Sequence, residues 1–340
     1  MSNFLRHLFS LHTETLIVTY KGYGRPDGVY IKGSVLRNRP TLSAAAGDGR
    51  FKNFRNMIAR YLSSPQAGQT VEVCLGVVTK TVKTDSKGYF EAWLEPEEEL
   101  APGWQAAICR LLQTGEGEDI HAPAPFLVTS DETARFGVIS DIDDTVLVSH
   151  ATRLFRKLWL VLTKNSRTRL PFAGVADFYE ALRGDATHAN PFFYVSSSEW
   201  NLYDFLDDFF AANHLPKGPF LLQQLKKGLK ELIFTGGGDH SHKEEKIRRL
   251  MELYPAMPFV LIGDSGQRDM SIYASVVRDF PGRVEAVYIR QISEKHVVPE
   301  TEQAIFDAAG VEVLLAADTL AVQEHARRIG LLSKPLAQNV

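Results

Sequence analysis

Cysteine is scarce in this chain. Its 340 residues include two cysteines, Cys74 and Cys109, and these do not form a CxxC pair. Two cysteines cannot build a disulfide framework, and without that spacing neither a zinc ribbon nor a redox motif is expected. Free thiols suit a reducing compartment, so we expect a cytoplasmic protein.

Long apolar runs are also missing. The longest obvious one, residues 158–162, has five residues, whereas a membrane-spanning helix needs roughly 20. The apolar stretches within residues 1–16 are too short for the core of a secretion signal. We therefore expect a soluble protein that is not secreted, and contact with a membrane surface is left open.

Neither sign of charge dominates. Lysine and arginine together number 38, aspartate and glutamate 41, and the formal net charge is -3. A general nucleic-acid binder would be strongly basic, so no nucleic-acid partner is expected. With 44% hydrophobic and 23% charged residues the composition is that of a globular protein. At roughly 100–200 residues per domain, the length predicts two domains.

The first predicted domain, residues 1–133, is rich in β-strands. Turn residues at 23–28 and 85–88 predict hairpins, and a small sandwich or barrel is expected. One helical insertion is predicted at residues 51–62, where apolar side chains recur at helical spacing. Short apolar runs between turn residues predict strands at residues 16–20, 29–36, 71–80, 88–94 and 104–112.

The second predicted domain, residues 134–340, alternates apolar strands with longer helical patterns, which is typical of an α/β fold with a parallel sheet. One apolar strand, residues 136–140, runs into Asp141 and Asp143. Ligands bind at this end of the strands in open α/β sheets. Strand alternation would point both carboxylates to one side, where they need a cation such as Mg²⁺.

The sequence of residues 141–145, DIDDT, resembles the DxDxT motif of the haloacid dehalogenase-like phosphatases. The family's other parts follow in the expected order: a strand at residues 191–195 that runs into Ser196, a helical stretch that begins at Lys243, and a strand at residues 259–262 that leads into Asp264 and Asp269. Four parts in order are far more specific than one. The resemblance implies a Rossmann-like (Rossmannoid) catalytic domain.

The resemblance also implies roles in catalysis. Asp141 would attack phosphorus and form an aspartyl-phosphate, and Asp143 would act alternately as acid and base. Ser196 and Lys243 would hold the non-bridging phosphoryl oxygens. Phosphoryl transfer depends mostly on such positioning and on charge neutralisation.

A Mg²⁺ site is part of the same expectation. Asp264 would complete it with the Asp141 carboxylate and the main-chain carbonyl of Asp143. Asp269 would orient either Lys243 or a metal-bound water, so it is included among the metal-site residues.

Some of these residues also have structural alternatives. Ser196 could cap a helix, with Ser197 or Ser198 contacting phosphate instead. Lys243 could be an ordinary surface lysine, and Asp269 could also be a helix cap.

Longer motifs narrow the resemblance. They are DIDDTV at residues 141–146, VSSSEWNLYD at residues 195–204 and IGDSGQRDMSIY at residues 262–273. These resemble the phosphatidate phosphatase catalytic domain of the yeast actin patch protein family, over roughly residues 134–330. The resemblance implies Mg²⁺-dependent release of phosphate from phosphatidate, which leaves diacylglycerol. The usual proline after the serines is Glu199 here, which bears on the shape of that loop.

Residues 151–170 carry positive charges and no negative ones, interleaved with aromatic and aliphatic side chains. Such a segment can lie in the headgroup region of an anionic membrane, or it can pack on the core as an ordinary helix. Its basic residues are Arg153, Arg156, Lys157, Lys164, Arg167 and Arg169.

The sequence thus predicts a Mg²⁺-dependent phosphatidate phosphatase whose partner is an anionic phospholipid. Two alternatives are left open. The chain could hydrolyse a soluble phosphomonoester, or it could be an inactive module that binds a membrane or a protein.

Overall fold

The chain is described from a computed structural model, which divides into two units. The first comprises Met1–Val128 and Asn201–Asp208, and the second comprises Thr129–Trp200 and Phe209–Val340. The described residues are 15–37, 63–112, 119–142, 174–184, 189–224, 241–265, 268–291 and 297–332. The predicted helix at 51–62, Asp143 and the basic segment 151–170 lie outside them.

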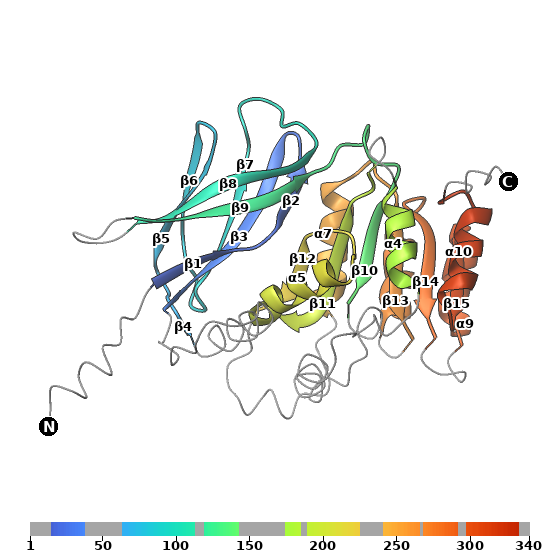
Figure 1. Cartoon of the computed structure of the whole chain (residues 1–340). Helices are drawn as coiled ribbons and strands as arrows, with labels where there is room; N and C mark the ends of the chain where they lie inside the picture. Colours follow the sequence, from blue (N-terminus) through green and yellow to red (C-terminus); the bar gives the residue numbers. More distant parts are fainter. Residues whose placement is uncertain are drawn as a thin grey trace, which may run out of the picture. The chain divides into compact units, whose positions relative to one another are not determined.

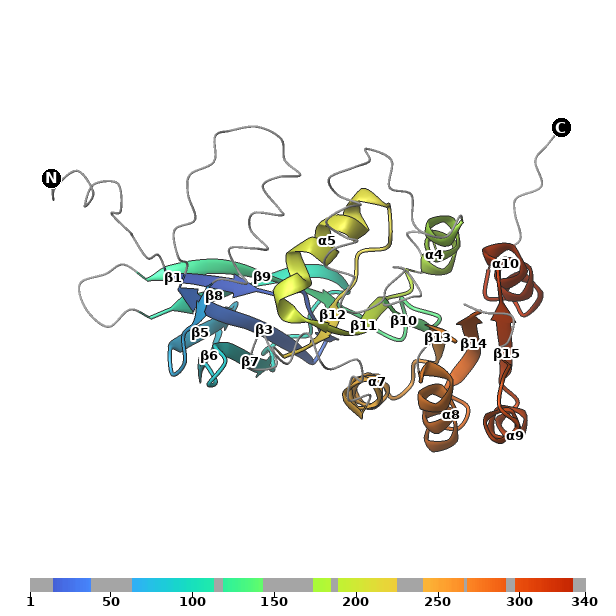
Figure 2. The same cartoon turned by 90° about the horizontal axis from the view of Figure 1, so that it is seen from below.

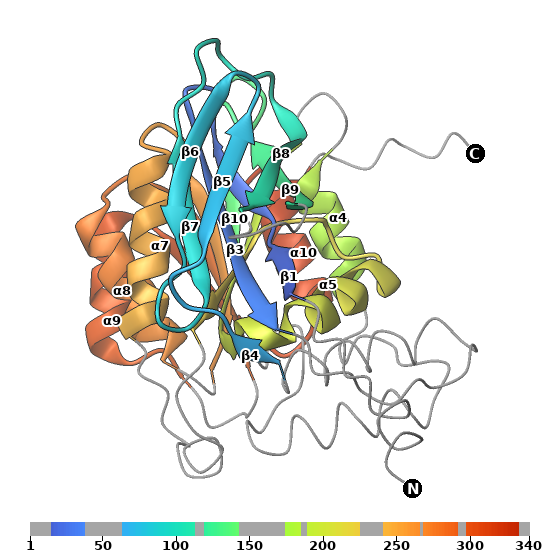
Figure 3. The same ribbon diagram turned by 90° about the vertical axis from the view of Figure 1, so that its left-hand side faces the viewer.

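The first unit is β-rich. Its strands are β1 (Thr15–Thr19), β2 (Gly22–Arg25), β3 (Gly28–Arg37), β4 (Ser64–Pro65), β5 (Thr70–Leu75), β6 (Val78–Lys83), β7 (Tyr89–Leu94), β8 (Gly103–Leu111) and β9 (Ile120–Val128). They form a sheet in the order β1-β3-β2-β9-β8-β5-β6, with β4 and β7 also paired to β3. Figure 3 shows β5, β6 and β7 of this sheet from the side. Buried side chains from β3, β5, β7, β8 and β9 share one core. The sheet therefore curls around that core.

The predicted hairpins have different outcomes. The one at residues 23–28 is confirmed, because Arg25 of β2 pairs with Gly28 of β3. At residues 85–88 a turn forms, but β6 pairs with β5 and β7 pairs with β3, so that hairpin was wrong. The single strand predicted at 71–80 is two strands, because Gly76 takes a left-handed conformation (φ 58°) that turns the chain between β5 and β6.

Strand β9 is not among the strands predicted from the sequence, because Pro123 and Pro125 interrupt the pattern of a strand. Both prolines pair with residues of β8, while β2 joins the other edge of β9 only from Phe126 onward. Proline lacks an N–H group and is tolerated where no neighbouring strand needs one.

The second unit contains a parallel sheet, as predicted, in the order β12-β11-β10-β13-β14-β15 (Figure 1). Its strands are β10 (Gly137–Asp141), β11 (Phe192–Glu199), β12 (Phe220–Gln223), β13 (Phe259–Asp264), β14 (Val284–Arg290) and β15 (Glu312–Ala316). Every residue of the central strands β10 and β13 is buried, as a sheet covered on both faces requires.

The described helices of the chain are α4 (Val175–Arg183), α5 (Tyr203–Ala212), α7 (Ser241–Leu253), α8 (Asp269–Asp279), α9 (Glu300–Ala309) and α10 (Thr319–Arg328), with a short 3₁₀ turn at Trp200–Leu202. Figure 2 shows α4 and α10 on one face of the parallel sheet and α7, α8 and α9 on the other. Helix α7 confirms the helical stretch predicted from Lys243, and it buries Ile247, Leu250 and Met251. No helix in the described residues is long and apolar enough to cross a membrane.

Candidate active site

Three buried acids meet at the carboxyl edge of the parallel sheet. Asp141 ends β10, Asp264 ends β13 and Asp269 begins α8. One carboxylate oxygen from each lies within 4.8 Å of the other two, and none of the three residues is exposed. Like charges this close repel strongly unless a cation lies among them. The cluster can therefore bind a metal ion.

Lys243 supplies one positive charge to this cluster. It lies in the first turn of α7 and is only 1% exposed. Its Nζ is 2.9 Å from Oδ1 of Asp141, and it also forms an ion pair with Asp269. Burial alone would lower the pKa of Lys243, but the two carboxylates outweigh it and hold that pKa above its usual value. Lys243 is therefore a buried, charged residue, and the surface-lysine alternative is wrong.

Asp269 uses both of its carboxylate oxygens within the cluster. Oδ1 accepts a hydrogen bond from Lys243, and Oδ2 accepts one from the backbone N–H of Asp264 at 3.1 Å. A Cβ atom at Gly263 would lie 2.5 Å from Oδ2 of Asp269, so glycine permits this close approach. The N-cap of α8 is Arg268, so Asp269 is not the helix cap.

The serines lie on the neighbouring strand β11, inside an irregularity of its pairing with β12. From Val195 to Glu199 strand β11 advances four residues, while the partners Leu221 and Gln223 are two residues apart. Ser196 is fully buried in this bulge, and its Oγ accepts a hydrogen bond from the backbone N–H of Ser198 at 2.8 Å. Because β11 continues to Glu199, Ser196 is not a helix cap.

Three hydroxyl groups that the sequence analysis did not identify form hydrogen bonds in and next to the strands that carry the acids. Ser140 donates from Oγ to the carbonyl oxygen of Asp141 at 2.8 Å, and the same Oγ lies 2.8 Å from the hydroxyl of Tyr179. On the other side, Tyr273 donates to the carbonyl oxygen of Ile262 at 2.8 Å. Burial raises the pKa of both tyrosines, so they remain neutral donors. The one signal in the sequence was a serine in an otherwise apolar strand.

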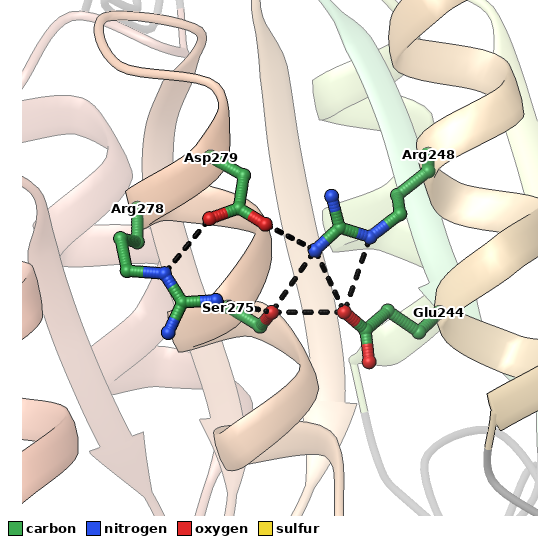
Figure 4. A network of polar contacts seen from close by, with 5 residues as sticks. All are labelled: Glu244, Arg248, Ser275, Arg278 and Asp279. Atoms are coloured by element: carbon green, nitrogen blue, oxygen red, sulfur yellow. Dashed lines mark hydrogen bonds and ion pairs between the residues drawn. The ribbon is translucent and has the colours of Figure 1, made fainter.

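A second polar network joins α7 and α8 farther along the helices (Figure 4). Oε1 of Glu244 accepts hydrogen bonds from Nη2 of Arg248 and Oγ of Ser275, each at 2.8 Å. Arg248 also pairs with Asp279, which accepts from Nε of Arg278 at 2.8 Å. We call these five residues the outer network.

The predicted site residues that the structure describes, all of them except Asp143, come together. Asp141, Lys243, Asp264 and Asp269 form one cluster, and Ser196 follows on the adjacent strand. The structure defines an open α/β unit with an acidic site that could hold a cation at the carboxyl edge of its sheet, where such sheets bind ligands.

The same region matches a known catalytic domain. Residues 136–291 match the family model described as "Phosphatidate phosphatase APP1, catalytic domain". The chain is 31% identical over 154 residues to Phosphatidate phosphatase APP1 of Saccharomyces cerevisiae, an alignment that covers 45% of this chain and 25% of that protein. An uncharacterized protein of Schizosaccharomyces pombe is 28% identical over 159 residues, covering 46% and 25%. The matched part spans about a quarter of these relatives, and it resembles the catalytic domain of a phosphoric monoester hydrolase.

The solved structures that align with this chain do so only at low TM-scores. A carbohydrate acetylesterase from Xanthomonas citri aligns at a TM-score of 0.27 and 13% identity, covering 78% of this chain and 65% of that one. A Bacteroides uniformis β-glucuronidase aligns at a TM-score of 0.26 and 8% identity, covering 81% and 35%.

Proposed function

We propose that this chain is a Mg²⁺-dependent phosphatidate phosphatase of the haloacid dehalogenase-like type, with its chemistry in residues 134–340. One observation carries the proposal: the cluster of Asp141, Asp264, Asp269 and Lys243 lies within the region that matches the phosphatidate phosphatase catalytic domain. The order of the motifs along the chain supports the haloacid dehalogenase-like assignment.

The charges of the cluster fit a divalent cation. Three carboxylates against one lysine leave a formal charge of -2 among the described site residues, which one Mg²⁺ would offset. Oxygen ligands are those that Mg²⁺ prefers. Asp141 and Asp264 would hold the ion, because both oxygens of Asp269 already accept hydrogen bonds from the protein. When bound, Mg²⁺ would neutralise charge on the phosphoryl group.

Asp141 is the nucleophile in this proposal. A carboxylate oxygen of Asp141 forms a bond to phosphorus as the bond from phosphorus to the glycerol oxygen breaks, and Asp143 gives its proton to that leaving oxygen. Asp143 then takes a proton from water, whose oxygen attacks phosphorus. The bond between Asp141 and phosphorus breaks, and phosphate leaves.

The remaining residues position the substrate. Lys243 holds a phosphoryl oxygen and reduces the repulsion between the substrate and the acids, and Asp269 orients Lys243. Ser196 binds a second phosphoryl oxygen through its hydroxyl group, and the hydrogen bond from Ser198 N–H to its Oγ fixes the position of that group.

A lipid substrate is favoured by the basic segment 151–170, which follows the nucleophile directly in sequence. Its positive charges would attract anionic phospholipid at a membrane surface, and we propose a cytoplasmic protein in peripheral contact with that membrane.

Phosphate release from phosphatidate and from glycerol 3-phosphate, each with Mg²⁺ and with EDTA, tests the proposal. We expect Mg²⁺-dependent release that is faster from phosphatidate. Equal rates on both would support the soluble-substrate alternative, and no release from either would support the inactive-module alternative.

A further inference from the structure

Two hydrogen-bond donors lie at the serine bulge, one within it and one on the neighbouring strand β12. The sheet order β12-β11-β10 places β12 beyond the serines as seen from Asp141. Gln223 ends β12 and is 8% exposed, and Ser197 lies in the bulge of β11 opposite this end. Both residues are therefore at the carboxyl edge, next to the proposed phosphoryl site.

Gln223 lies on the same face of the sheet as α7. The rings of Tyr194, Phe220 and Phe210 of α5 contact one another, which assigns Phe220 to the α5 face. Because side chains alternate along a strand, Gln223 lies on the opposite face, which α7 covers (Figure 2). From α7, Lys246 donates to the carbonyl oxygen of Ser196 at 3.1 Å and so holds the bulge.

The donors of Ser197 and Gln223 have no acceptor within the described part of the chain. Oγ of Ser197 and Nε2 of Gln223 are buried atoms with no hydrogen bond there. Leaving a buried donor unmatched is unfavourable, because the group has lost its bonds to water. One of these donors lies in the bulge of β11 and the other at the end of the adjacent strand β12. Two such donors at a ligand-binding edge indicate a ligand that brings acceptor oxygens.

We propose that Ser197 and Gln223 form a subsite for the acyl ester carbonyl oxygens of the lipid substrate. The inference rests on the proposed function and adds to it the residues that select a diacyl lipid. Phosphorus would lie between β10 and β11, about one and a half strand spacings, or roughly 7 Å, from β12. The glycerol backbone spans a similar distance between the phosphate and its acyl esters, and ester carbonyls are acceptors that need donors.

The test removes only the proposed acceptors. Dioleoyl phosphatidate is compared with its dioleyl ether analogue, which has the same phosphate, glycerol and chain length but no carbonyl oxygen, in identical detergent micelles. For the wild-type chain we expect kcat/KM to be about five- to tenfold higher for the ester lipid, the effect of about one buried hydrogen bond.

Gln223→Met keeps the size of the side chain and removes the amide donor, so the preference for the ester lipid should fall about fivefold. Gln303→Met makes the same change on α9 and should keep the wild-type preference. If Gln223→Met does not fold, as judged by its melting temperature, Ser197→Ala should show the same reduced preference.

The outcomes separate the two claims. Equal wild-type rates on the ester and ether lipids would overturn the subsite and leave the phosphatase proposal standing. An unchanged preference in Gln223→Met and Ser197→Ala would also overturn the subsite. No release from either lipid would overturn the proposed function and the subsite with it.

Discussion

Two polar clusters join the same pair of helices, α7 and α8, and they differ in burial. Lys243 and Asp269 in the site are at most 1% exposed, whereas the side chains of Arg248, Glu244 and Asp279 in the outer network are 30–32% exposed. Water and salt screen the outer charges but not the buried ones. Ion pairs between the same types of residue therefore contribute very different electrostatic energies in the site and in the outer network.

The change of environment occurs between neighbouring residues. Lys243 faces the buried acids, and Glu244, the next residue of α7, belongs to the outer network. The outer network ties the two helices together side by side, and the buried pair brings a charge to the proposed phosphoryl site. We expect changes in the site to affect turnover and stability strongly, and changes in the outer network to affect both weakly.

The largest expected effect is on turnover. Asp141→Asn removes the proposed nucleophile and should reduce phosphate release by about a thousandfold or more, with an unchanged circular dichroism spectrum. Asp279→Asn makes the same chemical change in the outer network and should keep wild-type turnover. Retained activity in Asp141→Asn would refute the role of Asp141.

The next largest difference between the two clusters should be in the free energy of unfolding. Lys243→Met leaves buried carboxylates without their lysine and should lower the free energy of unfolding by about 3–5 kcal/mol. Arg248→Met, a comparable truncation in the outer network, should lower it by about 1 kcal/mol or less. Urea unfolding at neutral pH in EDTA measures both values, and equal losses would contradict the comparison.

Metal binding should stabilise only through the buried cluster. At a Mg²⁺ concentration about 100 times its Kd, the wild-type chain should gain about 2.7 kcal/mol of unfolding free energy. Asp264→Asn should gain much less, and Asp279→Asn should gain as much as the wild type. Thermal melts with Mg²⁺ and with EDTA would show this, and a full gain in Asp264→Asn would contradict the proposed metal site.

The smallest expected effect is on the stability of the chain at low pH. Hydrogen bonds from Arg278 and Arg248 hold the pKa of Asp279 at about 2, below its ordinary value of 3.8. Because the folded-state pKa is the lower one, the stabilisation is present above pH 3.8 and is lost as the pH falls towards 2. The small difference in urea midpoint between wild type and Asp279→Asn should therefore shrink from pH 6 to pH 3. A midpoint difference that grows from pH 6 to pH 3 would contradict the lowered pKa of Asp279.

Much of this contrast could be predicted from sequence. The strands before Asp141, Ser196 and Asp264 are almost entirely apolar, so the sequence predicts their ends at one edge of a parallel sheet, and it predicts Lys243 at the start of a helix. These elements are confirmed because burial on both faces leaves a strong pattern in the sequence.

Other features left weak or misleading signals. The prolines of β9 hid that strand in the sequence, although they are tolerated where β2 does not pair with it. Tyr179 and Tyr273 look like ordinary core residues, because only tertiary packing brings their hydroxyls beneath the acids. The bulge at Ser196 and the donor of Gln223 depend on pairing between strands, which one strand's sequence does not specify.

The most direct test of the account is to look for phosphate on Asp141 during turnover. The chain is mixed with phosphatidate labelled in its phosphate and quenched in acid within a single turnover. We predict label on Asp141 that hydroxylamine removes, and none in Asp141→Asn. Turnover with label on another residue, or undiminished turnover in Asp141→Asn, would contradict the account.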